Sequence, residues 1–474
     1  MKRAGVRALR AAALVSCGYG PVAWGQPYPA STVITEVSFD FATHARLAPG
    51  SDNWPITWAD DGHQYGAWGD GGGFDGTNQD GRVSLGVARI EGPLSSHQGF
   101  NVWGGFNPEN PAQFTGKSYG ILSVGGTLYM WVSPDPKPHL TEARIAFSTD
   151  HGATWQQSSW AFTFADELTI PTFLNFGQDY AGARDGFVYS YYIHPQYGPG
   201  ESTAAEAVNG FHVHAPGELY LSRVPSDEIL TEGSYEFFGG LDTGGDPLWT
   251  SDRTEKQPVF RDANGVGWNV SASYNAGLGR YLLMTEHTLT HQAHLGMFDG
   301  PEPWGPWTTV VYTDAFGSGE IELTTFYWSF SNKWTSADGR SFTLVFTGRA
   351  SNDSWNVVEG AFEAESPAAG GAGGAGGSAG AGGATSTGGS GGAGLDAGAA
   401  PAGTSSTDDG CGCRVESLAA RRDERTSPPA PWWMLPLVVA ARRGARKRRP
   451  RQPDTAARRS AREHDAARAD TVSS

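Results

Sequence analysis

The sequence has very little cysteine. Of its 474 residues only three are cysteines, Cys17, Cys411 and Cys413, and none lies between residues 27 and 365. No disulfide bond can stabilise that stretch, so a hydrophobic core must hold it together. The stretch also lacks any long amphipathic helical pattern, whereas the chain is rich in glycine (66 residues) and aromatic side chains (12%). This combination is typical of an all-β domain with short strands and many turns.

Basic residues are scarce in the same region. Residues 27–365 hold 40 Asp and Glu against 15 Lys and Arg. Nucleic acids are bound through clusters of Lys and Arg that contact phosphates, so this acidic body is a poor candidate for nucleic-acid binding. A neutral or cationic partner, or a sugar such as a polysaccharide or an oligosaccharide, fits its charge better. We expect the protein to be a monomer.

A pattern of three short strands returns five times along the chain. Each repeat has an apolar inner strand, then a glycine-led strand rich in aromatic residues, then a third apolar strand. The glycine-led strands occupy 62–68, 126–131, 186–191, 279–284 and 339–345, and the inner strands before them occupy 54–59, 118–124, 171–176, 268–274 and 324–330. Such repeats are the blades of a β-propeller. The sequence therefore predicts a five-bladed β-propeller over residues 27–365, with the starts of its inner strands around one central pocket.

A turn motif supports this fold. The segment from Ser148 to Trp155 matches the Asp-box, Ser-x-Asp-x-Gly-x-Thr-Trp, of sialidases and other propellers. In this motif Ser and Asp bond the turn, Gly adopts the tight backbone conformation and Trp packs between strands. We interpret Asp150 as a structural residue of an outer hairpin, away from the central pocket.

The first repeat contains the best candidates for catalysis. Asp52 precedes the first inner strand, and Asp70 follows the antiparallel strand that returns to the same rim. Two carboxylates that face one pocket are the minimum for glycoside hydrolysis, one as acid and one as base. A separation of about 6.5–9.5 Å would indicate inversion and about 5–5.5 Å retention. The alternative interpretation is that both residues only form turns.

Other polar and aromatic residues near the ends of inner strands, or of the strands that follow them, are candidates for binding substrate. They are Asn53, Trp54, Lys117, Asp179, Asn269, Tyr274, Glu286, His287, Glu320 and Glu322. We expect no cofactor and no catalytic metal. The acidic stretch from Asp70 to Asp80 offers oxygen ligands for a structural Ca²⁺, but its spacing does not match an EF-hand.

Several segments of the body resemble the domain of unknown function 4185 family. They include Ser51-Asp52, Gly69-Asp70, Tyr220–Pro225, Trp268–Asn275, Pro301–Trp307 and Asn352–Asn356, so the resemblance covers roughly residues 33–362. It implies a five-bladed propeller and, from some members, an endo-acting glycoside hydrolase that cuts D-arabinan. Asp52 and Asp70 then occupy the family's acidic positions in the first blade. The chain has Gly-Asp-Gly where many relatives have Gly-Asp-Thr, which leaves its substrate open.

The N-terminus has the pattern of a secretory signal peptide over residues 1–26. Four basic residues within the first ten precede a short apolar run, which is the usual order in such peptides. Leu14–Cys17 also resembles a bacterial lipobox, in which Cys17 would be lipidated. A chance cysteine within the signal peptide is the alternative.

The C-terminal part divides into three segments. Residues 366–410 are almost entirely Gly, Ala, Ser and Thr, a composition typical of a disordered tether. Residues 411–449 contain a Gly-Cys pair, an apolar run and an Arg cluster, an order that resembles the myxobacterial C-terminal sorting signal, MYXO-CTERM. The resemblance implies a sorting protease as partner and Cys411 or Cys413 as the processed residue. The apolar run is short for a membrane span, and residues 450–474 form a further disordered tail.

Together these features predict a glycoside hydrolase that is secreted or anchored at the outer cell surface. Its substrate would be a polysaccharide, with arabinan-type chains as one candidate, cut by a two-carboxylate mechanism in the central pocket. The alternative is a non-catalytic carbohydrate-binding or adhesion propeller displayed at the cell surface. A binder would surround its axis with aromatic and amide side chains and have no pair of facing carboxylates.

Overall fold

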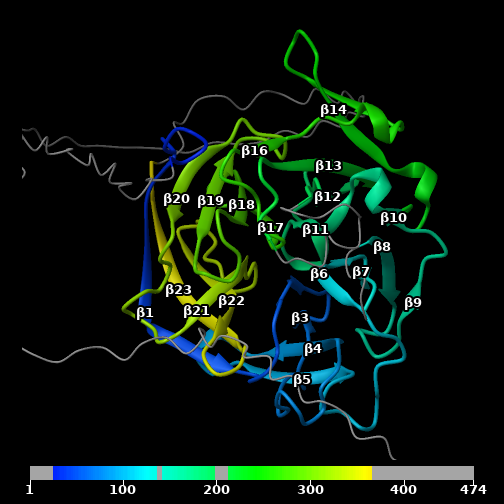
Figure 1. Ribbon diagram of the computed structural model, residues 1–474, viewed down its shortest axis with the longest axis vertical. Coiled ribbons are helices and arrows are strands. Elements are labelled where there is room, and N and C mark those ends of the chain that lie inside the picture. Colours follow the sequence, from blue (N-terminus) through cyan, green and yellow to red (C-terminus); the bar gives the residue numbers. More distant parts are fainter. Residues whose placement is uncertain (1–24, 136–140, 198–211, 366–474) are drawn as a thin grey trace, which may run out of the picture. The chain divides into compact units, whose positions relative to one another are not determined.

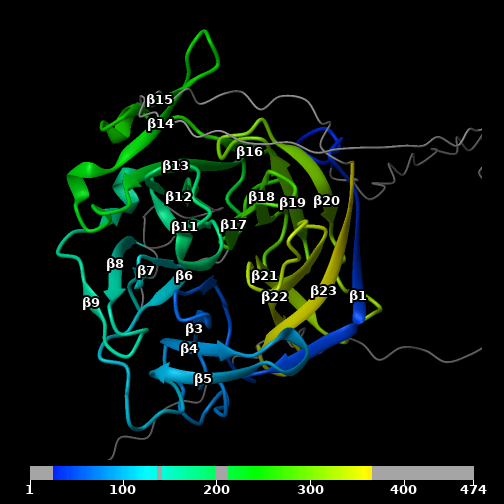
Figure 2. The same cartoon turned by 180° about the vertical axis from the view of Figure 1, so that it is seen from behind.

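The structure, a computed structural model, describes residues 25–135, 141–197 and 212–365. Regular structure in them is almost entirely β, with 23 strands and five short 3-10 helices. The strands form five blades around one axis (Figure 1; Figure 2). This arrangement confirms the predicted all-β, five-bladed propeller. Residues 1–24 of the predicted signal peptide, the linker, the sorting signal with its cysteines and the C-terminal tail lie outside the described residues.

Blades 1 and 2 each begin with an innermost strand and continue outward. Blade 1 consists of β2 (Ile56–Trp58), β3 (Gln64–Gly69), β4 (Leu85–Glu91) and β5 (Gln98–Trp103), with the 3-10 helix η1 (Leu94–Ser96) between β4 and β5. Blade 2 consists of β6 (Lys117–Val124), β7 (Thr127–Ser133), β8 (Glu142–Ser148), β9 (Gln156–Gln157) and β10 (Phe162–Thr163), followed by η2 (Phe164–Asp166).

Blades 3 and 4 share one hydrogen-bonded sheet. Blade 3 consists of β11 (Thr169–Asn175), β12 (Phe187–Ile193), β13 (Gly217–Pro225), β14 (Glu236–Leu241), β15 (Pro247–Thr250) and β16 (Phe260–Asp262), with η3 (Gln178–Tyr180), η4 (Glu232–Ser234) and η5 (Arg253–Glu255) in its loops. Blade 4 consists of β17 (Val270–Asn275), β18 (Arg280–Glu286), β19 (Leu295–Gly300) and β20 (Thr308–Thr313).

The last blade combines both ends of the propeller. It contains β21 (Thr324–Phe330), β22 (Ser341–Arg349), β23 (Trp355–Ala364) and, as its outermost strand, β1 (Ile34–Leu47). The N-terminal strand β1 pairs antiparallel with β23 from Ile34–Ala364 to Leu47–Trp355. Closing the ring through strands far apart in sequence leaves only short, protected edges.

The direction of the strands defines two faces. The innermost strands β11 and β17 are parallel, with Leu174 opposite Ala272, and each second strand runs antiparallel to its innermost strand. We call the end at which the innermost strands begin the N-terminal face. Residues that precede an innermost strand therefore share this face with residues that end a second strand.

Aromatic side chains fill the spaces between the blades. At the seam between blades 1 and 5, the fully buried Trp54 lies 5.5 Å from Trp68 and 5.2 Å from Trp355, measured between ring centroids. Burying such large side chains supplies most of the favourable free energy of a fold without disulfides. No helix among the described residues has the length and apolar character of a membrane span.

The Asp-box forms the turn that the sequence predicts. The Asp150 carboxylate accepts hydrogen bonds from Ser148 Oγ (2.7 Å), from Thr154 N (2.8 Å) and from Thr154 Oγ1 (2.6 Å). These bonds close the loop between β8 and β9, and Trp155 Nε1 donates to Gly152 O at 2.9 Å. Asp150 therefore has a structural role in blade 2.

Candidate functional site

The backbone of blade 1 brings Asp52 and Asp70 to the N-terminal face. Asp52 and Gly69 exchange two backbone hydrogen bonds of 2.9 and 2.8 Å, and Asp70 is the next residue. A Cβ at Gly69 would lie only 2.8 Å from Asp52 Oδ1, so glycine is needed for the carboxyl group to occupy this place. Asn53 (φ 52°) and Asp70 (φ 54°) both adopt the left-handed region, an uncommon conformation that clusters at functional sites.

Two cations hold Asp70. Lys117 Nζ lies 2.6 Å from Asp70 Oδ1, and Arg82 Nη2 lies 3.0 Å from Oδ2. The lysine side chain is 11% exposed, whereas that of Asp70 is 38% exposed. Lys117 begins β6, so blade 2 supplies the cation for a carboxylate of blade 1. Asp70 is thus a positioned carboxylate that remains accessible from solvent.

Asp52 has a different environment. Burial raises the pKa of Asp52 to about 8, Lys117 opposes the rise, and the negative charge of Asp70 adds to it. Its Oδ1 accepts one hydrogen bond of 3.0 Å, from Asn53 Nδ2. Near neutral pH the folded protein therefore holds a protonated Asp52 beside a charge-paired Asp70.

A second acidic group lies on blade 4. Glu286 ends β18 and is fully buried. It accepts hydrogen bonds from His291 N (2.7 Å) and from Asn269 Nδ2 (3.2 Å). Burial raises the pKa of Glu286 to about 8. Since its side chain is closed off from solvent, Glu286 holds its surroundings in place rather than facing a substrate directly.

Arg349 connects the two acidic groups. It ends β22 and forms an ion pair with Asp353, with nitrogen–oxygen distances of 2.6 and 3.3 Å. Its positive charge opposes the rise in the pKa of both Asp52 and Glu286. Arg349 therefore lies within electrostatic range of both carboxyl groups and favours their charged forms.

Aromatic rings line the region between these groups. Trp268 lies 5.4 Å from Tyr119 and 4.7 Å from His291, and His291 lies 4.2 Å from Phe326, all between ring centroids. The Arg349 guanidinium lies 5.3 Å from the centre of Phe326. Blades 1, 2, 4 and 5 thus contribute charged or aromatic side chains to one region of the N-terminal face.

The axis itself is nearly filled. The cavity along it has a volume of only about 20 Å³ and is lined by innermost-strand residues such as Gly120, Thr172, Ser271 and Tyr327. That space holds about one water molecule. This space is too small for a sugar chain to pass through the ring.

Several predicted substrate-binding residues lie elsewhere. Asp179 follows β11 and accepts hydrogen bonds from Ser123 Oγ (2.8 Å) and Gly126 N (3.0 Å) at the opposite face. Tyr274 lies near the end of β17, where it contacts Phe176 and Tyr281. Both residues stand at the ends of innermost strands, so the structure does not bring them to Asp52.

Four further predicted residues are also away from the carboxylates. Trp54 is enclosed in the aromatic core. His287 is buried within blade 4, where its ring stacks on Tyr312 at 3.7 Å and burial lowers its pKa to about 4. Glu320 and Glu322 are exposed in the loop between β20 and β21. The same loop lies against β1 at the outside of blade 5. At Gly317 of this loop, a Cβ would come into contact with Ile321 and with Phe41 of β1.

Several members of the cluster were not among the residues predicted from the sequence. Arg349 ends the second strand of blade 5. Asp70 and Glu286 occupy the corresponding positions in blades 1 and 4, after or at the end of the second strand. The rule that the end of a second strand lies on the N-terminal face would therefore have identified Arg349 as well. Tyr119 lies two residues after Lys117 on an innermost strand. Arg82 is in an irregular loop and carries no sequence signal.

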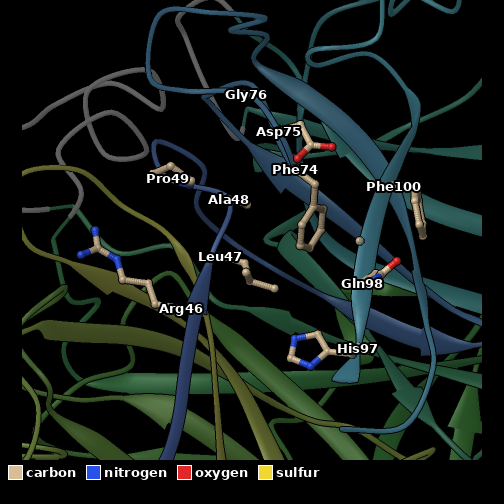
Figure 3. A pocket seen from close by; sticks show the side chains of 11 residues that line it. Arg46, Leu47, Ala48, Pro49, Phe74, Asp75, Gly76, His97, Gln98 and Phe100 are labelled. Atoms are coloured by element: carbon tan, nitrogen blue, oxygen red, sulfur yellow. The ribbon is translucent and has the colours of Figure 1, made fainter. Parts of the chain in front are cut away.

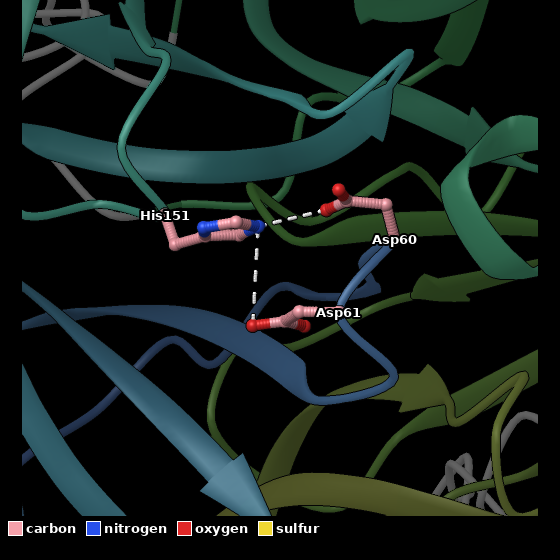
Figure 4. A group of neighbouring side chains, drawn as sticks. All are labelled: Asp60, Asp61 and His151. Atoms are coloured by element: carbon pink, nitrogen blue, oxygen red, sulfur yellow. Dashed lines mark hydrogen bonds and ion pairs between the residues drawn. The ribbon is translucent and has the colours of Figure 1, made fainter.

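Among the described residues, one group has ligand atoms close enough to hold a metal ion. Asp60, Asp61 and His151 place these atoms within 4.8 Å of one another (Figure 4). His151 Nε2 lies 2.8 Å from Asp60 Oδ1, and Asp61 Oδ2 already accepts a hydrogen bond of 2.7 Å from Tyr65. The contact between His151 and Asp60 joins the turn after β2 to the Asp-box of blade 2. The group differs from the Asp70–Asp80 stretch considered for Ca²⁺.

Comparison with known proteins identifies a family. The family model described as Domain of unknown function (DUF4185) matches residues 119–358, just over half of the chain. This match covers most of blades 2–5, without β1, and begins after Asp52 and Asp70. No curated protein sequence matches the chain.

Solved structures of glycoside hydrolases resemble the chain only weakly. The RS223 beta-xylosidase covers 68% of this chain and 98% of its own, with 14% identity and a TM-score of 0.40. A GH43_1 enzyme from Xanthomonas citri covers 71% and 92%, with 16% identity and a TM-score of 0.39. The beta-xylosidase/alpha-arabinofuranosidase CoXyl43, from a compost microbial metagenome, covers 67% and 95%, with 14% identity and a TM-score of 0.40. Scores this low carry no conclusion about substrate.

Proposed function

The chain belongs to the domain of unknown function 4185 family, and from that premise we propose that it hydrolyses glycosidic bonds of a polysaccharide. Asp52 and Asp70 are the proposed catalytic carboxylates. The observation that carries this proposal is the contrast between their environments. Burial favours the protonated form of Asp52 by raising its pKa to about 8, whereas Asp70 is paired with two cations.

This contrast assigns the two roles. Glycoside hydrolysis needs one carboxylic acid that protonates the leaving oxygen and one carboxylate that attacks or activates water. Pairs of carboxyl groups whose environments separate their pKa values are typical of such sites. Asp52 would donate its proton to the glycosidic oxygen, and Asp70 would act as the base or the nucleophile. Lys117 would fix the position of Asp70 through the 2.6 Å ion pair.

Arg349 and Glu286 have supporting roles in this mechanism. The guanidinium of Arg349 is anchored by Asp353 and supplies positive charge near Asp52. That charge limits how far burial raises the pKa of Asp52, so the acid can still release its proton during the reaction. Glu286 fixes the segment that contains His291 through a hydrogen bond to its backbone N–H.

The proposed substrate is a neutral glycan. The acidic body would repel a polyanion, and the family resemblance makes arabinan-type chains the first to test. Product chromatography after incubation with purified polysaccharides measures the activity. We expect oligosaccharides from at least one glycan, and a loss of at least ~100-fold in rate for Asp52→Asn and for Asp70→Asn.

Asp246→Asn is the control, because Asp246 is an exposed aspartate in the loop between β14 and β15 of blade 3, which supplies no residue to the proposed site. It should keep the parent activity. Full activity in both Asp52→Asn and Asp70→Asn would refute the site. Binding to a glycan without any product would favour the alternative, a carbohydrate-binding propeller.

We also propose that the protein is exported and processed at its C-terminus. The support is the sequence pattern: a signal-peptide-like N-terminus, a long Gly/Ala tether and a sorting-signal-like end with Cys411 and Cys413. Residues after Cys413 should be absent from the mature protein. Intact-mass analysis of protein from its native host tests this, and a mature chain that extends to Ser474 would contradict it.

A further inference from the structure

A second cavity lies at the seam between blades 1 and 5. Its volume is about 520 Å³, within the range of ~300–1,000 Å³ that is usual for small-ligand sites. Residues 46–49 from the end of β1, 74–76 from the loop after β3 and 97–100 from the start of β5 line it (Figure 3). We call it the seam pocket.

The aromatic wall of the seam pocket is fixed in advance. The Phe74 ring lies over Gly99, where a Cβ would come within 2.3 Å of the ring. Phe74 N donates to Asn101 Oδ1 at 2.9 Å, and the ring centroid is 5.5 Å from Trp54 and 5.8 Å from Trp355. A wall held this firmly loses little conformational entropy when a ligand binds.

His97 forms a second fixed wall. Its Nδ1 lies 2.8 Å from Leu94 O, and its Nε2 lies 3.3 Å from Trp355 Nε1. Since the indole N–H can only donate, Nε2 must accept, and the ring is therefore neutral in this arrangement. Burial also lowers the pKa of His97. His97 supplies shape to the pocket and no charge.

The rim combines exposed apolar and polar groups. Leu47 and Phe100 are 36% and 40% exposed, and Arg46, Asp75 and Gln98 are also exposed. Figure 3 shows Leu47, Phe74 and His97 around one space, with Phe100 and Gln98 on β5 at one side of it. A sugar ring has an apolar C–H face and hydroxyl groups that both donate and accept hydrogen bonds. An apolar wall with one cation, one anion and one amide at its rim matches a neutral sugar better than a charged ligand.

Two segments of the chain connect the seam pocket with the candidate catalytic site. Pro49 precedes Asp52 by three residues, and Phe74 follows Asp70 by four. Gly73 N donates to Ser51 Oγ at 2.9 Å, which joins the two segments between the pocket and the carboxylates. The pocket and the two carboxylates are therefore held together by the same two segments of the chain.

We propose that the seam pocket is a second binding subsite for the neutral polysaccharide, outside the catalytic cluster. This inference rests on the proposed glycosidase function for the identity of its ligand. Binding energy from sugar units remote from the cleaved bond would hold a polymer better than a short oligosaccharide. The pocket thus distinguishes long substrates from short ones.

Native electrophoresis of the full chain through gels that contain arabinan, arabinogalactan or xylan tests the proposal. All proteins carry Asp70→Asn, so that the polysaccharide stays intact. The double variant Gln98→Ala, Phe100→Ala should bind about tenfold more weakly, because it loses one aromatic and one hydrogen-bonding contact. Leu47→Trp, which fills the pocket, should bind as weakly. Leu248→Ala is the matched control, since Leu248 is 50% exposed on β15, and its binding should not change.

Kinetics with intact Asp70 provide the second readout. The double variant should raise KM for the polysaccharide about tenfold with little change in kcat, and should leave KM for a disaccharide or trisaccharide unchanged. Equal retardation of the parent and both pocket variants overturns the seam pocket, as does the absence of retardation in all gels. If Asp70→Asn abolishes hydrolysis but the two pocket variants bind the polysaccharide as the parent does, the pocket proposal fails and the glycosidase function stands. Pocket-dependent retardation without hydrolysis by the parent supports the pocket and refutes the glycosidase function.

Discussion

Replacement of Asp52 by asparagine should stabilise the protein in alkaline solution. The amide has the shape of the carboxyl group but never ionises, and its oxygen can still accept the hydrogen bond from Asn53. In the folded protein burial raises the pKa of Asp52 to about 8 from an ordinary value of 3.8. The folded state therefore binds a proton that the unfolded chain releases between these two pH values. The stability associated with this proton is complete below pH ~4 and is lost as the pH rises through about 8.

The magnitude follows from the two pKa values. One pH unit corresponds to ~1.4 kcal/mol, so the full difference would be worth ~6 kcal/mol above pH 8. Asp52 is only partly buried by its accessible surface, and solvent screening reduces this figure to about one third, or ~2 kcal/mol. Asp52→Asn should thus be ~2 kcal/mol more stable than the parent at pH 9 and nearly equal to it at pH 4.

Urea unfolding followed by tryptophan fluorescence at pH 4, 6.5 and 9 measures this difference. Glu286 contributes to the pH dependence of both proteins in the same direction, because burial also raises its pKa to about 8, so only the difference between the two curves reports on Asp52. Asp75→Asn, at an exposed position with a φ of 61° that asparagine tolerates, should show no such trend. A difference independent of pH, or a less stable Asp52→Asn at pH 9, would refute the reasoning.

Three further changes have defined outcomes. Lys117→Met removes the charge that opposes the rise in the pKa of Asp52. The alkaline limb of the pH–rate profile should therefore move to a higher pH by about one unit. A limb that does not move would show that Lys117 has no influence on the pKa of the catalytic acid. Asp150→Ala removes three hydrogen bonds of the Asp-box and should lower the free energy of unfolding by ~1–3 kcal/mol, while the rate of hydrolysis at low temperature stays unchanged. Trp54→Ala leaves a cavity among buried aromatic rings and should cost ~3–5 kcal/mol in urea unfolding; a cost under ~1 kcal/mol would contradict the described core.

Strand positions could be predicted from the sequence because they depend on local alternation and on turn residues. The inner strand proposed at 324–330 coincides with β21, and that proposed at 118–124 differs from β6 by one residue. The partner of β1 could not be predicted in this way. Its pairing with β23 joins residues more than 300 positions apart, and no local pattern records which distant strand closes the ring.

The candidate site was partly predictable because strand direction decides which face a residue reaches. This rule brought Asp52, Asp70 and Lys117 to one place. Asp179 and Tyr274 follow or end innermost strands and so lie at the other face, which the same rule implies. The complete burial of Glu286 and the pairing of Arg82 with Asp70 depend on tertiary contacts, which a single sequence does not reveal.

Hydrolysis in water enriched in ¹⁸O tests the central claim most directly. The full chain is incubated with the polysaccharide that it cleaves, and the products are analysed by mass spectrometry. If Asp52 and Asp70 hydrolyse glycosidic bonds, each cleavage introduces one heavy oxygen at the new reducing end, and neither Asp52→Asn nor Asp70→Asn forms labelled product at a comparable rate. Unlabelled products, or labelled products that form equally fast in both variants, would contradict the account.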